Sequence, residues 1–513
     1  FADDLRLRRR AVEKIAVQEI EIHTMKFAAQ AALLCVFGIL PMGTAPVAQP
    51  SLSATVANMR SVNGDVYGAH IVSTSPHVLG GEVATMRTEV QGLRFILQQC
   101  TGAVCLGTYF DGERLFSVNI NNTALPRSPA PEAYLRALRI LGTLQFLAPD
   151  FVARGGNIYD GGYATFNGRR CRRIFVSDKI AIPMIVYVDP QTWLVAGAQD
   201  VDGNATYAMR DYRKVGRYQL PFEIDRNGAT LETYTNRTIS PGALQAPRGL
   251  TGTLTTDAAA MMLDPQSATP LGTCMLGNVS ARCLIDSGNS AMSMSLELAE
   301  QLGLKPVGML HVAGLGDYAT EVVRAGPLQI GNVRFPKANY IVLSDIHRYG
   351  YDIVIGADVL ASMPVTIDYN AHALFFGRSD QENGAGTIVP LEFENFVPVV
   401  NVTLGDRTTS LAIDTGDQSN INLAYEYYQH HPNLFKATKT ETVGGVGGSS
   451  VELIGEIALV RIGTLIAQNQ QIGTTKTLKG TADGHLGAGF LSQYRIVLDY
   501  AHERMRLYPM KPM

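Results

Sequence analysis

Residues 283–288 read Cys-Leu-Ile-Asp-Ser-Gly, and residues 411–416 read Leu-Ala-Ile-Asp-Thr-Gly. In both stretches a short apolar run leads into an aspartate, which is followed by a small hydroxyl residue and a glycine. The aspartates are Asp286 and Asp414. An apolar run that ends in a turn signal predicts a buried strand, so we expect each aspartate to stand at the end of one.

The residues that follow the two aspartates repeat as well. A glycine-rich stretch comes next in each case, at residues 314–316 and 444–448. An apolar segment that ends in Gly-Ala follows further on, and Ile-Asp-Tyr or Leu-Asp-Tyr comes last. Because several landmarks recur in one order at a nearly constant offset, we interpret residues 263–380 and 390–513 as two copies of one domain, called here the first copy and the second copy.

This order of landmarks resembles that of the retropepsin-like aspartic peptidases, and the tandem resembles the two-lobed, pepsin-like arrangement. The resemblance covers residues 268–509. It implies a mainly β fold in which two retropepsin-like β-barrel lobes in tandem form a pseudo-dimer. It also implies that Asp286 and Asp414 are the catalytic pair and that the glycine-rich hairpins are flaps over substrate. The implied loop-support residues are Ser287, Gly288, Thr415 and Gly416, and the implied flap residues are Gly314, Gly316, Gly445, Gly447 and Gly448.

Two carboxyl groups explain why the motif is needed twice. When they lie a few ångströms apart they cannot both ionise, so the pair shares one proton. The ionised member then acts as general base on a water molecule, and the protonated member polarises the scissile carbonyl. A chain with both copies builds this site alone, so we expect a monomeric endopeptidase that acts on polypeptide. No Cys and His spacing reads as a metal site, and we expect no metal and no cofactor.

Three positions depart from the family's pattern. The residue after the motif glycine is usually small, but here it is Asn289 in the first copy and Asp417 in the second. A third carboxylate at Asp417 would raise the pKa values of the pair, unless its side chain points to solvent. The second copy also has His485 where the first has Val354. We interpret His485 as an edge-exposed or core histidine rather than a catalytic one.

The first half of the chain is expected to be a separate β domain. Residues 51–235 alternate short strands and turns, interrupted by one helix that begins at Pro131. Residues 236–262 are rich in Thr, Pro, Gly and Ala, as in a linker. Residues 186–221 look like the later strands of the LolA-like and LolB-like fold, which is a curved antiparallel sheet wrapped over helices. The resemblance implies possible contact with an envelope lipid or protein; the simpler interpretation is a scaffold for the peptidase.

These features leave a competing hypothesis for the function. A lone Asp-Ser/Thr-Gly tripeptide is also an ordinary turn, in which the aspartate accepts backbone N–H bonds. The chain could therefore be a non-catalytic periplasmic binding protein. It would use the same cleft, together with the N-terminal sheet, to hold peptide or lipid.

Residues 25–48 have the layout of a secretory signal peptide. They begin with Met-Lys, continue with an apolar run over residues 27–40 and end in small residues up to Ala48. We interpret the charged residues 1–24 before them as a non-native extension. We therefore expect an exported protein, periplasmic or secreted, in an oxidising compartment.

Composition indicates the class of protein and its partners, and cysteine spacing indicates which disulfides can form. Hydrophobic residues make up 46% of the chain and charged residues 17%, which is typical of a packed globular protein. The net charge is −3 and no dense basic run occurs, so we expect no nucleic-acid partner. Cys100 and Cys105 are spaced to bridge a tight loop, and Cys274 and Cys283 flank a predicted hairpin. Cys171 is left over.

Overall fold

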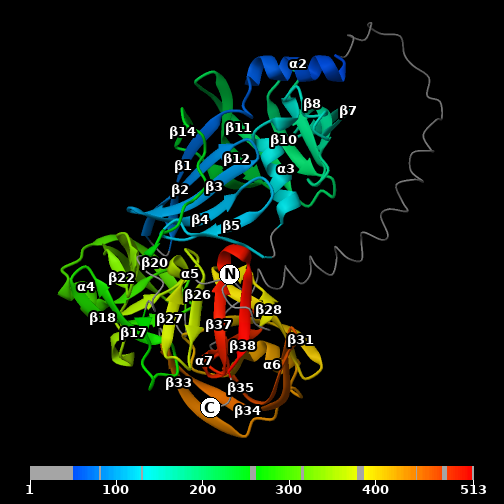
Figure 1. The fold of residues 1–513 in the computed structure, drawn as a ribbon. Helices are drawn as coiled ribbons and strands as arrows, with labels where there is room; N and C mark the ends of the chain where they lie inside the picture. The colour runs from blue at the N-terminus through cyan, green and yellow to red at the C-terminus, as the bar shows by residue number, and fades with distance from the viewer. Residues whose placement is uncertain are drawn as a thin grey trace, which may run out of the picture. The chain divides into compact units, whose positions relative to one another are not determined.

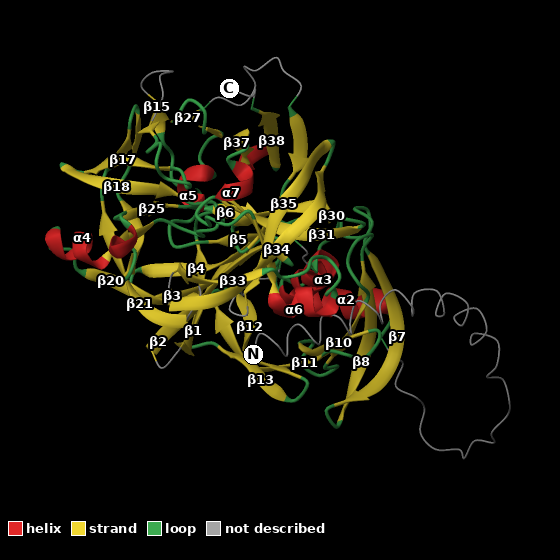
Figure 2. Cartoon of the chain, turned by 90° about the horizontal axis from the view of Figure 1, so that it is seen from below, coloured by secondary structure: helices red, strands yellow, loops and turns green. Residues whose placement is uncertain are grey.

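A computed structural model describes residues 50–79, 82–128, 131–254, 261–313, 317–377, 386–445, 448–475 and 482–510. Strands make up most of the described chain and the helices are short, so the predicted mainly β fold is confirmed (Figure 2). Within these ranges, every helix is too short or too polar to cross a lipid bilayer. The expected extension, the expected signal peptide and three expected flap residues (Gly314, Gly316 and Gly447) lie outside the described residues.

The first half of the chain forms two antiparallel sheets of seven strands each, drawn from blue to green in Figure 1. Tight turns connect the strands of the first sheet, and Gly92 and Gly102 adopt the positive φ that such turns require. In spatial order its strands are β14 (Asn236–Ser240), β1 (His70–Leu79), β2 (Glu82–Gln91), β3 (Arg94–Thr101), β4 (Val104–Phe110), β5 (Leu115–Val118) and β6 (Ala124–Pro126).

The second sheet follows the chain order and packs against helices. Helix α3 (Glu132–Gly142) begins after Pro131, as predicted, and it buries Ala137, Ile140 and Leu141 against the sheet. Helix α2 (Leu52–Asn63) was not predicted, because its buried face includes the polar residues Thr55 and Asn63. The remaining elements are η1 (Gln145–Leu147) and the strands β13 (Ala229–Thr233), β12 (Tyr218–Arg226), β11 (Thr206–Val215), β10 (Val195–Asp200), β9 (Met184–Val188), β8 (Arg169–Ser177) and β7 (Asn157–Phe166).

The first copy contributes a sheet of ten strands. In spatial order these are β15 (Thr253–Leu254), β23 (Val333–Phe335), β22 (Leu328–Ile330), β17 (Leu271–Leu276), β18 (Val279–Ile285), β25 (Ile353–Ile355), β19 (Ser293–Ser295), β24 (Ala338–Leu343), β21 (Asp317–Ala325) and β20 (Pro306–Ala313). Its short helices are α4 (Leu296–Gln301), η2 (His347–Tyr349) and α5 (Ala357–Leu360).

The second copy contributes a sheet of eight strands with the same pairing scheme at its centre. In spatial order these are β29 (Glu392–Glu394), β30 (Val397–Leu404), β31 (Arg407–Asp414), β36 (Gly484–Gly487), β32 (Ile421–Ala424), β35 (Leu465–Thr475), β34 (Gly448–Ile462) and β33 (Lys439–Gly445). Its short helices are α6 (Tyr425–His430), α7 (Ala488–Leu491) and η3 (Tyr500–His502). In both copies the strand that leads to the aspartate has one parallel neighbour, β25 beside β18 and β36 beside β31.

A sheet of six strands joins the two copies. The central pair is antiparallel: Val365 lies opposite Leu498, and Ile367 lies opposite Ile496. These two strands hold equivalent positions in the sequence repeat. In spatial order the strands are β16 (Met261–Met262), β27 (Ala373–Phe376), β26 (Val365–Asp368), β37 (Tyr494–Asp499), β38 (Arg504–Pro509) and β28 (Thr387–Pro390).

Residues 236–262, which we expected to be a linker, contribute strands to three of these sheets. Strand β14 pairs with β1, β15 with β23 and β16 with β27. The described parts of this segment, residues 236–254 and 261–262, are therefore held by backbone hydrogen bonds to distant strands, which the sequence pattern does not encode. The structure also contains both disulfides that the cysteine spacing allows, Cys100–Cys105 and Cys274–Cys283, and Cys171 is a buried free thiol.

A buried carboxylate connects the first half of the chain to the first copy. Asp358, at the start of α5, is 1% exposed and accepts four hydrogen bonds. Three come from the loop between β5 and β6: Asn119 Nδ2 at 2.7 Å, Asn121 Nδ2 at 2.8 Å and Thr123 Oγ1 at 2.7 Å. The fourth comes from the backbone N–H of Met292, at 2.9 Å. One side chain thus holds this loop against the segment that follows Asp286.

Replacing this carboxylate tests how much the connection stabilises the fold. The substitution Asp358→Ala leaves several buried donors without an acceptor, so we expect a loss of about 3 kcal/mol in the free energy of unfolding. Urea denaturation followed by far-ultraviolet circular dichroism measures the loss. Asp202→Ala is the control because Asp202 is exposed, and we expect a change of less than about 0.5 kcal/mol. Equal stability of the two variants would contradict this account.

Candidate active site

Two equivalent strands carry Asp286 and Asp414 to one place. Strand β18 ends at Ile285, and the backbone N–H of Asp286 donates a hydrogen bond to the carbonyl of Ile355 on the parallel strand, at 3.0 Å. Strand β31 ends at Asp414, which pairs with Gly487 on its own parallel neighbour. The last three residues before each aspartate, 283–285 and 411–413, are apolar and buried, as the sequence predicts, because there the strand has a parallel neighbour in the centre of its sheet.

The residues after the two aspartates hold each other through reciprocal hydrogen bonds. Ser287 Oγ donates to the carbonyl of Ile413 at 2.6 Å, and the backbone N–H of Thr415 donates to the same hydroxyl at 3.1 Å. The second copy makes the equivalent bonds: Thr415 Oγ1 donates to the carbonyl of Ile285 at 2.8 Å and accepts from the N–H of Ser287 at 3.0 Å. Both hydroxyl side chains are fully buried. These four bonds fix one aspartate loop relative to the other.

The two glycines allow the carboxyl groups to approach. A Cβ atom at Gly288 would lie 2.6 Å from the carboxyl carbon of Asp414, and one at Gly416 would lie 2.5 Å from that of Asp286. Non-bonded carbon atoms do not approach this closely, so any side chain at either glycine would displace the opposite carboxyl group. The glycines also donate their N–H groups to their own aspartate, Gly288 at 2.8 Å and Gly416 at 3.0 Å.

Burial and mutual repulsion raise the pKa values of the two carboxyl groups. Burial raises the pKa of Asp286 well above its ordinary value, and the charge of Asp414 and the hydrogen bond between the two side chains raise it further. Burial and the charge of Asp417 also raise the pKa of Asp414, and they outweigh the charge of His485 and the contact with Asp286, which lower it. The two groups therefore titrate as a pair, and the charge of His485 beside Asp414 favours ionisation of that member.

Two of the residues that depart from the family's pattern lie beside this pair. The Nδ1 atom of His485 is 3.4 Å from a carboxylate oxygen of Asp414 and 3.8 Å from one of Asp417. The Asp417 side chain is 22% exposed and accepts hydrogen bonds from the N–H and the hydroxyl of Ser419, so it does not point away to solvent. The interpretation of His485 as an edge or core residue overlooked these contacts. The signal was the break in the repeat at positions 417 and 485.

The strands on either side of each glycine-rich stretch pair with each other in antiparallel register. In the first copy β20 pairs with β21 up to Ala313 and Asp317, which flank the expected flap residues Gly314 and Gly316. In the second copy β33 pairs with β34 up to Gly445 and Gly448. A Cβ atom at Gly444 would lie 3.0 Å from the hydroxyl of Tyr349 in the first copy, so this second hairpin reaches across to the other copy.

Among the described residues, no group of three or more His, Cys, Asp and Glu side chains is arranged so that it could hold a metal ion. What the site presents is two carboxyl groups whose pKa values are both raised, with a partly exposed histidine beside Asp414. Such a pair can supply one acid and one base at the same moment.

The hydroxyl of Thr415 can be removed with little change in shape. Thr415→Val leaves the N–H of Ser287 and the carbonyl of Ile285 without their buried partners, so we expect unfolding to become easier by about 3 kcal/mol. Thr415→Ser keeps the hydroxyl and loses one methyl group, for which we expect about 1 kcal/mol. The midpoints of thermal unfolding compare the two variants. If Val proved as stable as Ser here, the reciprocal bonds would not be what holds the loops.

Residues 272–359 match the family described as Aspartyl protease. The matched stretch begins in β17 and ends in α5, so it includes Asp286 but not Asp414. None of the curated proteins compared with the chain matches it. This similarity confirms the predicted resemblance to aspartic peptidases for the matched part of the first copy, which is an aspartyl-protease-like region.

Proposed function

We propose that this protein is an aspartic endopeptidase whose catalytic pair is Asp286 and Asp414. The observation that carries the proposal is that each carboxyl group lies against the glycine that follows the other aspartate, at the ends of equivalent strands. The aspartyl-protease-like region at residues 272–359 supports peptidase chemistry in general. The reciprocal bonds of Ser287 and Thr415 support a site that is built from both copies.

The chemistry follows from which carboxyl group holds the proton. Ionised Asp414 takes a proton from a water molecule while the water oxygen attacks the carbonyl carbon of the peptide. Protonated Asp286 gives its proton to the carbonyl oxygen, and a tetrahedral diol forms. The carbon–nitrogen bond then breaks as the amine nitrogen takes a proton from the pair, and the second proton of the diol returns to the carboxylates. One carboxyl group and one carboxylate remain, as at the start.

We further propose that the two copies are retropepsin-like lobes in tandem that form a pseudo-dimer. The symmetric register of β26 and β37 and the matching order of strands around Asp286 and Asp414 support this arrangement. A chain that contains both halves of its site has no need of a second subunit, so the proposal includes a monomer. The hairpins that end near Gly445 and residue 314 would be the flaps.

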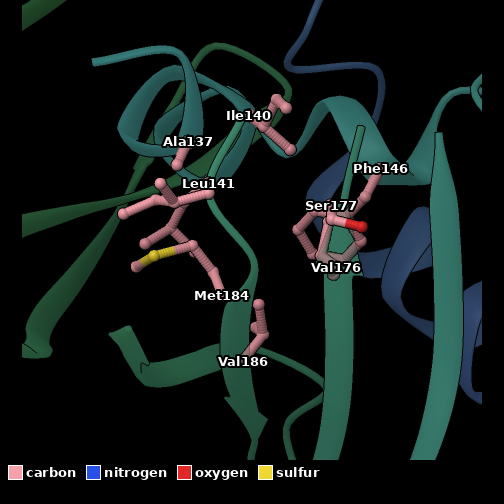
Figure 3. A pocket seen from close by; sticks show the side chains of 9 residues that line it. Ala137, Ile140, Leu141, Phe146, Val176, Ser177, Met184 and Val186 are labelled. Atoms are coloured by element: carbon pink, nitrogen blue, oxygen red, sulfur yellow. The ribbon is translucent and has the colours of Figure 1, made fainter. Parts of the chain in front are cut away.

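The competing hypothesis gives the N-terminal half a lipid-binding role, as in the LolA-like and LolB-like fold. A cavity lies between α3 and the strands β8 and β9, with Leu141, Val176 and Met184 in its lining (Figure 3). Its volume is about 10 Å³, which is room for one water molecule rather than an acyl chain. A wider hollow of about 660 Å³ is lined by charged side chains that include Arg94 and Arg136, which does not suit an apolar chain. These cavities favour a scaffold role for this half.

Export remains a proposal that rests on two observations. Residues 25–48 have a basic start, an apolar centre and a small-residue end. The disulfides Cys100–Cys105 and Cys274–Cys283 are stable in an oxidising compartment such as the periplasm or the cell exterior.

Amide substitution of one catalytic carboxyl group tests the peptidase proposal. Asp286→Asn removes the acidic proton but keeps the shape and the N–H contact from Gly288, so we expect hydrolysis of a denatured protein substrate to fall at least about 1,000-fold. Circular dichroism is expected to stay unchanged. The matched control is Asp406→Asn, an exposed aspartate in the turn before β31, which should cleave like the parent protein. Retention of activity in Asp286→Asn would refute the assignment, and so would an inactive parent protein across the pH range.

A reporter fusion tests export. Residues 1–48 placed before a bacterial alkaline phosphatase, which needs an oxidising compartment to form its disulfides, should give phosphatase activity in a bacterial host. Deletion of the apolar residues 27–40 should abolish that activity. Equal activity with and without these residues would contradict the signal-peptide interpretation.

A further inference from the structure

The environment of the carboxyl pair differs between the two copies at one strand position. In the first copy Val354 occupies it, on β25, and packs in an apolar cluster with Leu310, Ile341 and Ala291. In the second copy His485 occupies it, on β36, with paired strands on both sides. The imidazole of His485 is therefore held by a central strand. It places a titratable group where the first copy has the apolar side chain of Val354.

The contacts of His485 bring it to the two carboxylates of its own copy. Its Nδ1 atom lies 3.4 Å from Asp414 and 3.8 Å from Asp417, and the side chain is 22% exposed. Asp417 is itself fixed, because one of its oxygens accepts the N–H of Ser419 and the other accepts the Ser419 hydroxyl, both at 2.8 Å. A fixed carboxylate can hold the protonated ring in place against the thermal motion of a side chain.

On the basis of the proposed function, we propose that the protonated His485, held by Asp417, is a positioning residue that keeps Asp414 ionised and so leaves the shared proton on Asp286. In a symmetric pair the proton would have no preferred side. Here one neighbour with a positive charge stands on the side of Asp414 only. Asp414 is thereby the base and Asp286 the acid already in the free protein, before substrate binds.

The other charged groups near the ring agree with this role. Burial lowers the pKa of His485, but the neighbouring carboxylates of Asp417 and Asp414 outweigh burial and raise it, so the ring is charged in acidic solution. Burial raises the pKa of Asp417, but His485 and Ser419 together lower it. Glu452 on β34 is 5% exposed, and burial and the charge of Asp417 raise its pKa to about 7, so it adds no negative charge at acidic pH.

Two substitutions separate the charge of His485 from its shape and its hydrogen bond. His485→Asn keeps a donor near the position of Nδ1 but has no charge, and His485→Val introduces the residue of the first copy. The pH at which cleavage is half-lost on the acid side marks protonation of Asp414. Without the neighbouring positive charge, Asp414 takes a proton more readily, so we expect this pH to rise by about one unit in both variants. Wild-type behaviour of His485→Asn would overturn the proposal, because a hydrogen bond alone would then suffice.

A second measurement does not depend on activity. The carbon-13 resonance of the His485 ring, assigned by its absence in His485→Asn, is followed from pH 4 to 9. Because linkage is reciprocal, the pKa of His485 should be above its ordinary value in the parent protein and should fall in both Asp414→Asn and Asp417→Asn. An unchanged His485 titration in Asp414→Asn would overturn the proposal. Loss of the peptidase function would instead be seen as an inactive parent protein, with the His485 titration still coupled to Asp414.

Discussion

Two carboxyl groups that would repel each other as anions face one another where two buried strands end. Burial raises the pKa values of both groups and makes their joint ionisation costly, which is why the proposed mechanism places one proton between Asp286 and Asp414. Glycines that leave room for the opposite carboxyl group, backbone N–H donors and the paired hydroxyls of Ser287 and Thr415 all serve this contact. The six-stranded sheet between the copies then holds the two loops in register.

The same strand scheme carries different surroundings in the two copies. The segment after Asp286 is tied to the first half of the chain through Asp358, and the position of Val354 is apolar. The second copy has no aspartate at the position equivalent to Asp358, where Gly489 stands, and has His485 in place of Val354. The repeated strand scheme thus brings the two aspartates to equivalent positions. The residues around them differ between the copies, and this makes the surroundings of the two carboxyl groups unequal.

The sequence predicted the features that depend on local pattern and repetition. Apolar runs before Asp286 and Asp414, the strand pairs that flank the glycine-rich stretches and the helix after Pro131 are encoded within a few residues, and the structure contains each of them. Other features depend on distant partners and left no local signal. Strand β14 exists because β1 is beside it, and the approach of His485 to Asp414 depends on how β36 lies between its neighbours.

The most direct measurement of the central claim is a titration of the two carboxyl groups by carbon-13 NMR with labelled aspartate. Resonances of Asp286 and Asp414 are assigned from the corresponding Asn variants. The account predicts two coupled steps, with Asp286 remaining protonated to a pH well above the ordinary range of an aspartate and its resonance responding when Asp414 ionises. Two independent titrations near the ordinary aspartate pKa of about 4 would show that the side chains share no proton, and would contradict the account.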